Sequence, residues 1–272
     1  QKRLRLFSTW EITRYLIPVA PQHFRRVLRQ NPDLPQGASE TEGGAKWFTL
    51  DEVLRLRAHF AAEGSRAKEY LPYRPKGQPA KIVAVANFKG GVGKTSTAAH
   101  LAMSAALDGY KVLVIDLDPQ GNASTALGAE HTSGTTSSYE LLIGEAEAAD
   151  AVQPHPDNPN LFCIPATIDL AGAEIELVSM VRREYRLHDQ IRRGFLDEHG
   201  FDYVFIDCPP SLGLLTINAM TAVDEVLIPI QCEYYALEGV GQLLGNIGMI
   251  REHLNNSLHI SAIVLTMYDA RT

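Results

Sequence analysis

From about residue 80 onward, short apolar runs alternate with longer stretches in which apolar residues recur at helical spacing. Nearly uninterrupted apolar runs are typical of strands that are buried on both faces of a parallel sheet. Six runs are expected to be strands: residues 82–86, 111–115, 161–164, 203–206, 226–230 and 260–265. Helical patterns lie between them, most clearly at 96–107, 174–195 and 234–254. This alternation predicts an α/β fold with a parallel sheet and helices on both faces.

The front of the chain follows another pattern, made of short helices with clear start signals. Ser8 and Glu11 have the spacing of a capping box, which predicts a helix over 9–16. Pro21 suits the first turn of a second helix, over 21–30. Two short helices with a tight joint indicate a helix-turn-helix.

A wing and a third helix are expected next. The stretch 35–45 is rich in Pro, Gly and Ser and leads into Trp47 and Phe48, which predicts a hairpin with a glycine turn. Thr49 and Glu52 form a second capping box, and the helix that they begin should end before Gly64. The order helix, helix, wing, helix resembles the winged helix-turn-helix of MerR-type DNA-binding domains.

Charge is spread unevenly between front and back. Residues 1–80 carry 14 Lys and Arg against 8 Asp and Glu, although the whole chain has a net charge of −7. The second front helix presents Arg25, Arg26 and Arg29, which are candidate DNA contacts. The alternative is a small helical domain with a solvated basic face. We expect a DNA-binding domain over 1–66, a Pro/Gly-rich linker over 67–79 and a second domain over 80–272.

The chemistry of the second domain is expected where the first strand meets its helix. Residues 89–95 read Lys-Gly-Gly-Val-Gly-Lys-Thr. Successive glycines let backbone N–H groups approach a phosphate closely, and the following helix points its positive end at the same place. Lys94 would reach the β- and γ-phosphates, and the Thr95 hydroxyl would hold Mg²⁺. The nucleotide contacts are expected from Gly90, Gly91, Val92, Gly93, Lys94, Thr95 and Ser96.

This loop departs from the usual P-loop pattern at its first position. The pattern requires glycine at 88, but Phe88 stands there, and a second lysine, Lys89, follows it. The alternative is a glycine-rich turn with two surface lysines, which the strand-loop-helix context makes improbable.

Carboxylates follow two of the other apolar runs. Asp116 and Asp118 come after the run 111–115, and Asp207 closes the run 203–206. In open α/β sheets the carboxyl ends of the strands face the ligand. An acidic residue at such an end, downstream of a phosphate loop, is the Walker B arrangement that holds Mg²⁺. We therefore expect Asp116 and Asp207 near the metal.

Composition excludes several classes of protein. With 45% hydrophobic and 21% charged residues, the chain is typical of soluble globular proteins, and its apolar runs are too short to span a membrane. Its three cysteines form no CxxC pair, which fits a reducing cytoplasm. An iron–sulfur ATPase, like the nitrogenase iron protein, would need cluster cysteines in other contexts.

With these residues in hand, the sequence closely resembles the ParA family of DNA-partition ATPases. Residues 89–95 look like the family's deviant Walker A loop, including its extra lysine, residues 116–122 resemble a Walker A′ element, and residues 207–211 resemble Walker B. Residues 164–174 and 229–234 also look like family segments. A winged domain ahead of the ATPase is similar to the larger plasmid type, sometimes called RepA.

The resemblance implies a mechanism. Lys89 would cross a dimer interface to the partner's phosphates, Asp118 would orient the attacking water, and ATP would favour a sandwich dimer that binds DNA. It also implies a ParB-like centromere-binding partner and a location on the nucleoid in the cytoplasm. Family members continue further, with more sheet and basic surface, so we expect this chain to be truncated.

Two other functions stay open. The protein could be an ATP-regulated transcriptional repressor, since a winged domain serves repression and partition equally. It could also be a MinD-like ATPase of the membrane surface, although the basic front domain argues against that function.

Overall fold

The computed structural model describes residues 5–39, 41, 43–63, 77–232 and 236–269. Contacts divide the chain into two units, one built mainly from residues up to 78 and the other mainly from residues 79–272. Most of the predicted linker, residues 67–76, lies outside the described residues.

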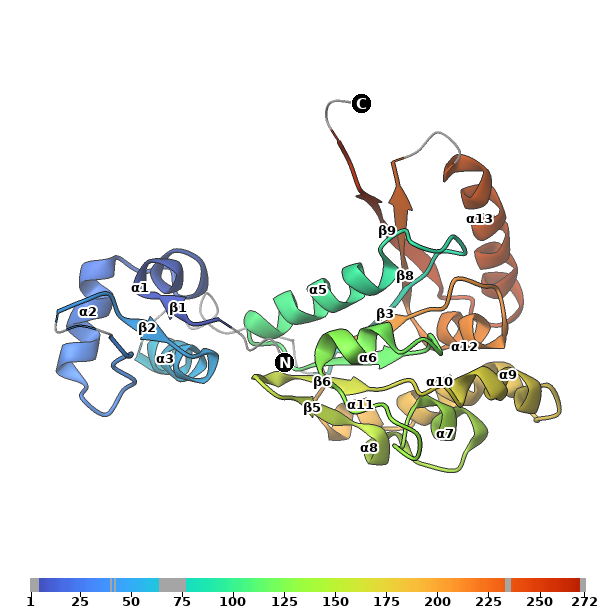
Figure 1. Cartoon of the computed structure of the whole chain (residues 1–272), viewed down its shortest axis with the longest axis horizontal. Helices are drawn as coiled ribbons and strands as arrows, with labels where there is room; N and C mark the ends of the chain where they lie inside the picture. The colour runs from blue at the N-terminus through green and yellow to red at the C-terminus, as the bar shows by residue number, and fades with distance from the viewer. Residues whose placement is uncertain (1–4, 40, 42, 64–76, 233–235, 270–272) are drawn as a thin grey trace. The chain divides into compact units, whose positions relative to one another are not determined.

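The N-terminal unit has its three helical segments where the patterns predict them (Figure 1). The full set of described elements also includes two short strands. The elements are β1 (Phe7–Ser8), α1 (Thr9–Glu11), the π-helical turn η1 (Ile12–Leu16), α2 (Pro21–Gln30), β2 (Trp47–Phe48) and α3 (Leu50–Glu63). Both predicted capping boxes form: Glu11 N donates to Ser8 Oγ at 3.3 Å, and Thr49 N donates to Glu52 Oε2 at 2.8 Å. The order of the elements is as expected, while their identity as a winged helix-turn-helix stays a prediction.

Aromatic rings hold this unit together. Phe24 of α2 stacks on Phe60 of α3 with ring centroids 5.8 Å apart, and it meets the edge of Phe48 at 6.1 Å. Each of the three is at least 94% buried. Such rings contribute most of the apolar area in a core this small.

The predicted hairpin wing is reduced to a single antiparallel bridge between Ala38 and Trp47. β2 pairs instead with β1, a strand that the sequence pattern missed. Gly37 explains the tight approach: its φ is +69°, and a Cβ there would lie 2.7 Å from the ring of Phe48. At Gly37 the chain packs directly against the aromatic core, so little of the predicted wing forms a strand.

The second unit is an α/β domain. Its elements are β3 (Lys81–Val85), α5 (Lys94–Leu107), β4 (Val112–Asp116), α6 (Asn122–Leu127), α7 (Ser138–Ile143), α8 (Ala148–Ala151), β5 (Gln153–His155), β6 (Asn158–Ile164), α9 (Leu170–Val178), η2 (Arg183–Tyr185), α10 (Arg186–Arg192), α11 (Phe195–Glu198), β7 (Tyr203–Asp207), α12 (Leu214–Ala222), β8 (Glu225–Gln231), α13 (Ala236–His253) and β9 (His259–Thr266). The strands lie in the order β5-β6-β4-β7-β3-β8-β9. Neighbouring strands are parallel along the sheet from β6 through β4, β7, β3 and β8 to β9. Only two residues connect β5 to β6, and two strands joined by so short a connection can pair only in the antiparallel direction.

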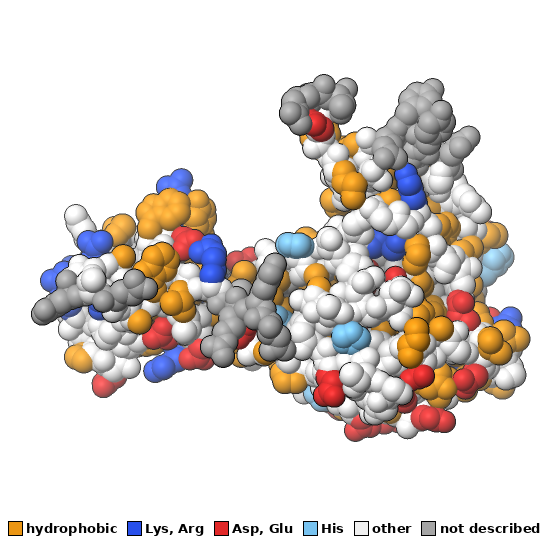
Figure 2. All heavy atoms as spheres, in the orientation of Figure 1, with side chains coloured by type: hydrophobic (Ala, Val, Ile, Leu, Met, Phe, Trp, Pro, Cys, Tyr) orange, Lys and Arg blue, Asp and Glu red, His pale blue; other side chains and the backbone are white. Residues whose placement is uncertain are grey.

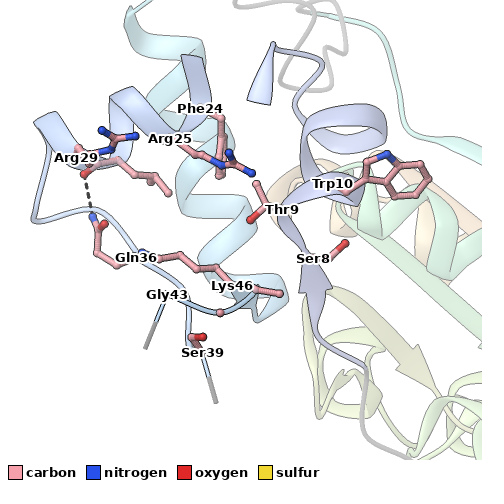
Figure 3. A pocket seen from close by; sticks show the side chains of 13 residues that line it. Ser8, Thr9, Trp10, Phe24, Arg25, Arg29, Gln36, Ser39, Gly43 and Lys46 are labelled. Atoms are coloured by element: carbon pink, nitrogen blue, oxygen red, sulfur yellow. Dashed lines mark hydrogen bonds between the residues drawn. The ribbon is translucent and has the colours of Figure 1, made fainter. Parts of the chain in front are cut away.

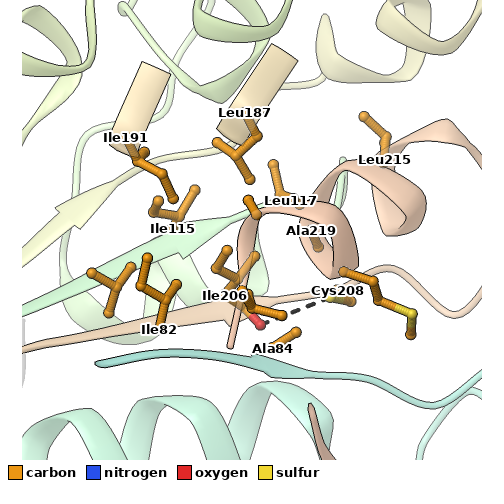
Figure 4. Close-up of a cluster of buried hydrophobic side chains, with 14 of the residues drawn as sticks. Ile82, Ala84, Ile115, Leu117, Leu187, Ile191, Ile206, Cys208, Leu215 and Ala219 are labelled. Carbon is orange, nitrogen blue, oxygen red and sulfur yellow. Dashed lines mark hydrogen bonds between the residues drawn. The ribbon is translucent and has the colours of Figure 1, made fainter. Parts of the chain in front are cut away.

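Alternate residues of the central strands face opposite layers of helices. Ile82, Ile115 and Ile206 point toward Leu187 and Ile191 of α10, as Figure 4 shows. The other face is covered by α5, whose buried residues Ala98, Ala102 and Ala106 recur every four positions. Small residues along that stripe let α5 approach the sheet closely, which places the start of the helix over the strand ends.

One predicted helix is wrong. The pattern over 174–195 predicts a continuous helix, but the chain forms α9, η2, α10 and α11 in succession. Arg182 has a φ of +56° and Gly194 a φ of +103°, both outside the helical region. Val181, one of the apolar residues of that pattern, is 84% exposed. The apolar spacing persists through the breaks, so it gave no warning of them.

Other elements were missed or displaced. The polar stretch 133–138 leads into α7, whose start is capped by Ser137 and Glu140; that capping box is visible in the sequence. The short elements β5, α6 and α8 carried no pattern long enough to detect. Of the helix predicted over 234–254, residues 236–253 are helical, and 234–235 lie outside the described residues.

Candidate nucleotide and nucleic-acid sites

Three strand ends bring the predicted catalytic residues of the second unit together. β7 lies between β3 and β4, and Asp207 is in register with Val85 on one side and with Asp116 on the other. The loop that begins after β3 therefore starts beside the two carboxylates. Because all three strands are parallel, their carboxyl ends form one edge, where an α/β sheet binds its ligand.

The glycine loop has the backbone of a phosphate-binding loop. Gly91 and Gly93 have φ values of +73° and +86°, a region that favours glycine. α5 begins at Lys94, so its unpaired N–H groups and the positive end of its dipole lie at the loop. Gly90 and Ser96 are exposed, as is Lys89 at the loop entrance.

Lys94 lies inside this loop and is only 7% exposed. Its Nζ donates a hydrogen bond to the carbonyl oxygen of Lys89 at 3.2 Å. Burial lowers the pKa of Lys94, and the carboxylates of Asp207 and Asp118 oppose that shift. A buried ammonium whose hydrogen bond goes to a neutral carbonyl is poised to move onto a phosphate, which would neutralise its charge.

Asp116 is fully buried and heavily hydrogen-bonded. Its Oδ2 accepts from the backbone N of Ser124 at 2.8 Å and from Ser124 Oγ at 2.7 Å, while its Oδ1 accepts from Asp118 N at 3.1 Å. Burial raises the pKa of Asp116, against the effect of the Ser124 hydrogen bonds. In this geometry Asp116 first of all braces the turn that carries Asp118; a direct metal contact stays a prediction.

Asp118 lies in that turn and is 9% exposed. Its Oδ1 accepts from Gln120 N at 3.0 Å, which fixes the carboxylate relative to its own loop. Its charge opposes the lowering of the pKa of Lys94 and adds to the raising of the pKa of Asp207, so the three residues share one electrostatic environment.

Asp207 differs from Asp116, because neither of its carboxylate oxygens accepts a hydrogen bond from any residue that the structure describes, although Asp207 is fully buried. Burial raises the pKa of Asp207 to about 7. The neighbouring Thr95 hydroxyl opposes that shift, but it is not placed to form a full hydrogen bond. Buried polar groups are almost always satisfied. An unsatisfied carboxylate beside a hydroxyl and a phosphate loop fits a hard cation such as Mg²⁺, which prefers oxygen ligands.

Three supporting residues escaped the sequence analysis: Ser124, Asn87 and Thr266. Ser124 braces Asp116, Asn87 bonds to the loop entrance, and Thr266 Oγ1 donates to Val92 O at 2.9 Å. Each acts across a large sequence separation or from an ordinary residue type. No motif could have identified Ser124 or Thr266, whereas Asn87 directly precedes the recognised loop.

In the N-terminal unit, Arg25 and Arg29 line one groove of about 600 Å³ (Figure 3). Lys46 reaches it from the segment before β2, and the polar side chains of Thr9, Gln36 and Ser39 complete the lining. Arg26 does not line the groove; it bonds to Nδ1 of His23 at 2.8 Å. The structure thus groups two of the three predicted arginines and adds a lysine. Blue side chains are frequent on this unit in Figure 2.

A family model described as an AAA domain matches residues 80–260. The sporulation initiation inhibitor protein Soj of Bacillus subtilis is 50% identical over 192 residues, covering 71% of this chain and 74% of that protein. The chromosome partitioning protein ParA of Caulobacter vibrioides is 50% identical over 193 residues, covering 71% and 72%.

Solved structures agree on the fold. A structure described as cobyrinic acid a,c-diamide synthase from Mycobacterium smegmatis, with a bound ATP analogue and magnesium, matches with a TM-score of 0.66 and 40% identity, covering 71% of this chain and 77% of that one. The McdA(D38A)–ATP complex of Cyanothece matches with a TM-score of 0.61 and 32% identity, covering 69% of each chain.

Within the described residues, no helix combines the length and the apolar character needed to cross a membrane. The family match spans the second unit from β3 to the start of β9, and with it most of the parallel sheet. The chain belongs to the family of ParA/Soj-type partition ATPases and has their α/β P-loop fold.

Proposed function

We propose that this protein is a Mg²⁺-dependent ATPase that acts in DNA partition. The observation that carries the proposal is Asp207, a fully buried carboxylate without a hydrogen-bond partner, beside Thr95 and the phosphate loop. The ATP analogue and magnesium bound by the similar structure from Mycobacterium smegmatis support the same ligands here.

Each residue then has a distinct task. Lys94 and the backbone N–H groups of residues 90–96 bind the phosphates, and Thr95 and Asp207 hold Mg²⁺, with Asp116 bracing the metal side of the site. Asp118 orients the water that attacks the γ-phosphate. Magnesium, when bound, neutralises phosphate charge as it develops.

Lys89 is the residue that makes the site depend on a second subunit. Its side chain is exposed at the loop entrance, while Lys94 already serves the phosphates from inside. We infer that ATP brings two copies into a sandwich dimer in which each Lys89 reaches the partner's nucleotide. The dimer binds DNA, and hydrolysis, stimulated by a ParB-like protein, releases it.

The N-terminal unit would bind a specific DNA site and repress transcription of its own operon. The groove lined by Arg25, Arg29 and Lys46 supports this role, because cationic side chains around a concave surface suit a phosphate backbone. We place the protein in the cytoplasm, associated with the nucleoid.

The proposal is tested by titrating the purified protein with ATP, with and without Mg²⁺, and by comparing Lys94→Ala with Lys81→Ala. Lys81 is an exposed lysine on β3 that pairs with Glu225, so it controls for the loss of a positive charge. Removal of the buried ammonium should weaken ATP binding by about 10²-fold, the scale of one lost charged hydrogen bond. Equal ATP affinity for both variants would overturn the proposal.

A further inference from the structure

Asn87 joins the entrance of the phosphate loop to the neighbouring strand. It follows β3 by two residues and is only 7% exposed. Its Nδ2 donates to the carbonyl oxygen of Pro229 at 2.7 Å, and its Oδ1 accepts from the backbone N of Lys89 at 3.0 Å. One side chain therefore contacts both a strand of the sheet and the lysine at the loop entrance.

The register of the sheet explains why an asparagine is needed. β3 and β8 pair up to Val85 and Leu227, and Ala86 N still donates to Leu227 O at 3.1 Å. Carbonyls two residues apart on a strand face the same edge, so Pro229 O also faces β3. The main chain of β3 turns away into the loop before it can supply the next donor. Asn87 Nδ2 takes the place of that donor.

The other end of the amide sets the loop. A carbonyl can only accept and a backbone N–H can only donate, so Pro229 O and Lys89 N together require a side chain that offers one donor and one acceptor. Aspartate lacks the donor, and leucine lacks both. The hydrogen bond from Lys89 N two residues downstream also closes a tight local turn.

Both backbone groups of Lys89 are thus hydrogen-bonded. Its N–H is bonded to Asn87, and its carbonyl accepts the Lys94 ammonium at 3.2 Å. If Lys94 moves to a phosphate, the bond to Asn87 persists and still orients the Lys89 backbone. Asn87 then still fixes the backbone from which the exposed side chain of Lys89 extends.

We propose that Asn87 is a positioning residue that orients Lys89 for its partner-dependent step. This inference rests on the proposed function, in which Lys89 reaches the nucleotide of a second copy. Asn87 has no part in holding ATP within its own subunit. Its loss should impair ATP-driven dimerisation and hydrolysis and spare ATP affinity.

The test compares Asn87→Leu, which keeps the branching at Cγ and removes both polar atoms, with Thr266→Val in the full chain. Thr266 also contributes one hydrogen bond to the loop, but at Val92 in its interior. Asn87→Leu should reduce hydrolysis by about 10²-fold, the scale of a small misplacement of a reacting group, with little change in ATP affinity. Thr266→Val should weaken ATP binding instead. Should Asn87→Leu not fold, as shown by its thermal unfolding, Asn87→Ala, which also removes both hydrogen bonds, replaces it with the same expected result.

A second comparison separates positioning from a general structural role. In the Lys89→Ala background, Asn87→Leu should add almost nothing to the loss of hydrolysis, because both changes remove the same contribution. The inference would be overturned if the fold-losses in hydrolysis rate of the two single variants multiplied in the double variant. It would also be overturned if ATP affinity fell as much as the hydrolysis rate.

Failure of the proposed function would look different. The wild-type protein would then neither bind nor hydrolyse ATP, and the variants would have no rates to compare. Amide hydrogen exchange still tests the geometry in that case: the Lys89 N–H should exchange more slowly than that of Gly90, for which no such partner is seen among the described residues. Exchange of Lys89 as fast as in an unfolded peptide would overturn the inference.

Discussion

The two units place their candidate sites in opposite ways. In the second unit the key side chains are buried: Asp116 and Asp207 are fully inaccessible, and Lys94 is 7% exposed. In the N-terminal unit, Arg25 and Arg29 are exposed and line a shallow groove. Burying charged groups costs free energy, so the buried carboxylates and lysine of the second unit indicate a ligand that compensates this cost. Exposed arginines remain hydrated and carry little free-energy cost, so their presence is weaker evidence for a function.

The buried site therefore allows sharper experiments than the exposed groove. The largest effect is expected at Lys89, the proposed catalytic residue that is exposed and not buried. Lys89→Ala should keep ATP binding and lose hydrolysis by about 10³–10⁵-fold, as for a cationic finger supplied by a partner. Mixing it with Lys94→Ala should restore some activity, since one subunit then holds ATP while the other offers Lys89.

Hydrolysis assays should run beside a direct measurement of the heterodimer by analytical ultracentrifugation. A heterodimer that forms without regaining activity would assign Lys89 to its own subunit. Lys89 would then no longer be an exposed residue that acts in the site of a second subunit.

Asp118 tests whether the buried carboxylates divide their work. Asp118→Ala should bind ATP and hydrolyse it about 10²–10⁴-fold more slowly, the usual contribution of a positioned acid or base. It should also accumulate as the ATP-bound dimer. Single-turnover hydrolysis and size-exclusion chromatography check both points. Normal turnover would move the water-orienting role to Asp116.

Asp207 should make the nucleotide-free protein sensitive to pH. Its pKa is raised from 3.8 to about 7 in the fold, so between these values the native state holds a proton that the unfolded chain releases. The free energy of unfolding should therefore fall as pH rises from about 4 to 7, by at most about 4 kcal/mol from this group.

Asp207→Asn cannot ionise and should lose that part of the pH dependence. Denaturant unfolding at several pH values measures it, with Asp197→Asn, on the exposed side of α11, as the control. Identical slopes for wild type and Asp207→Asn would mean that Asp207 is ionised without its ligand.

The smallest effects are expected at the exposed groove. Arg25→Ala and Arg29→Ala should each weaken DNA binding and reduce the slope of log affinity against log salt by about 0.9, the loss of one phosphate contact. Arg26→Ala is the control, since Arg26 bonds to His23 and does not line the groove. Fluorescence anisotropy on the nucleotide-free full chain measures all three. Equal effects at the three arginines would indicate a diffuse basic face.

Local signals predicted the elements that have strong boundaries. The two capping boxes and Pro21 located the front helices, and the apolar runs located the main strands to within three residues at either end. The break at Arg182 could not be predicted, because Arg182 is an ordinary residue in a left-handed backbone conformation, whereas Gly194, at the last break, was a visible signal. β1 was missed for a similar reason: two residues form a strand only when a distant partner, here β2, is present.

The sequence by itself predicted which residues would meet phosphate and metal, since the glycine loop and the strand-end carboxylates are local patterns with one common physical use. Only the tertiary structure decided how those residues differ. Asp116 accepts hydrogen bonds from Ser124 and Asp118, eight and two positions along the chain, while Asp207 has no hydrogen-bond partner among the described residues. The same holds for Asn87, whose value depends on the carbonyl of Pro229, 142 residues away. Hydrogen bonds of this kind are set by strand register, which no local stretch of sequence encodes.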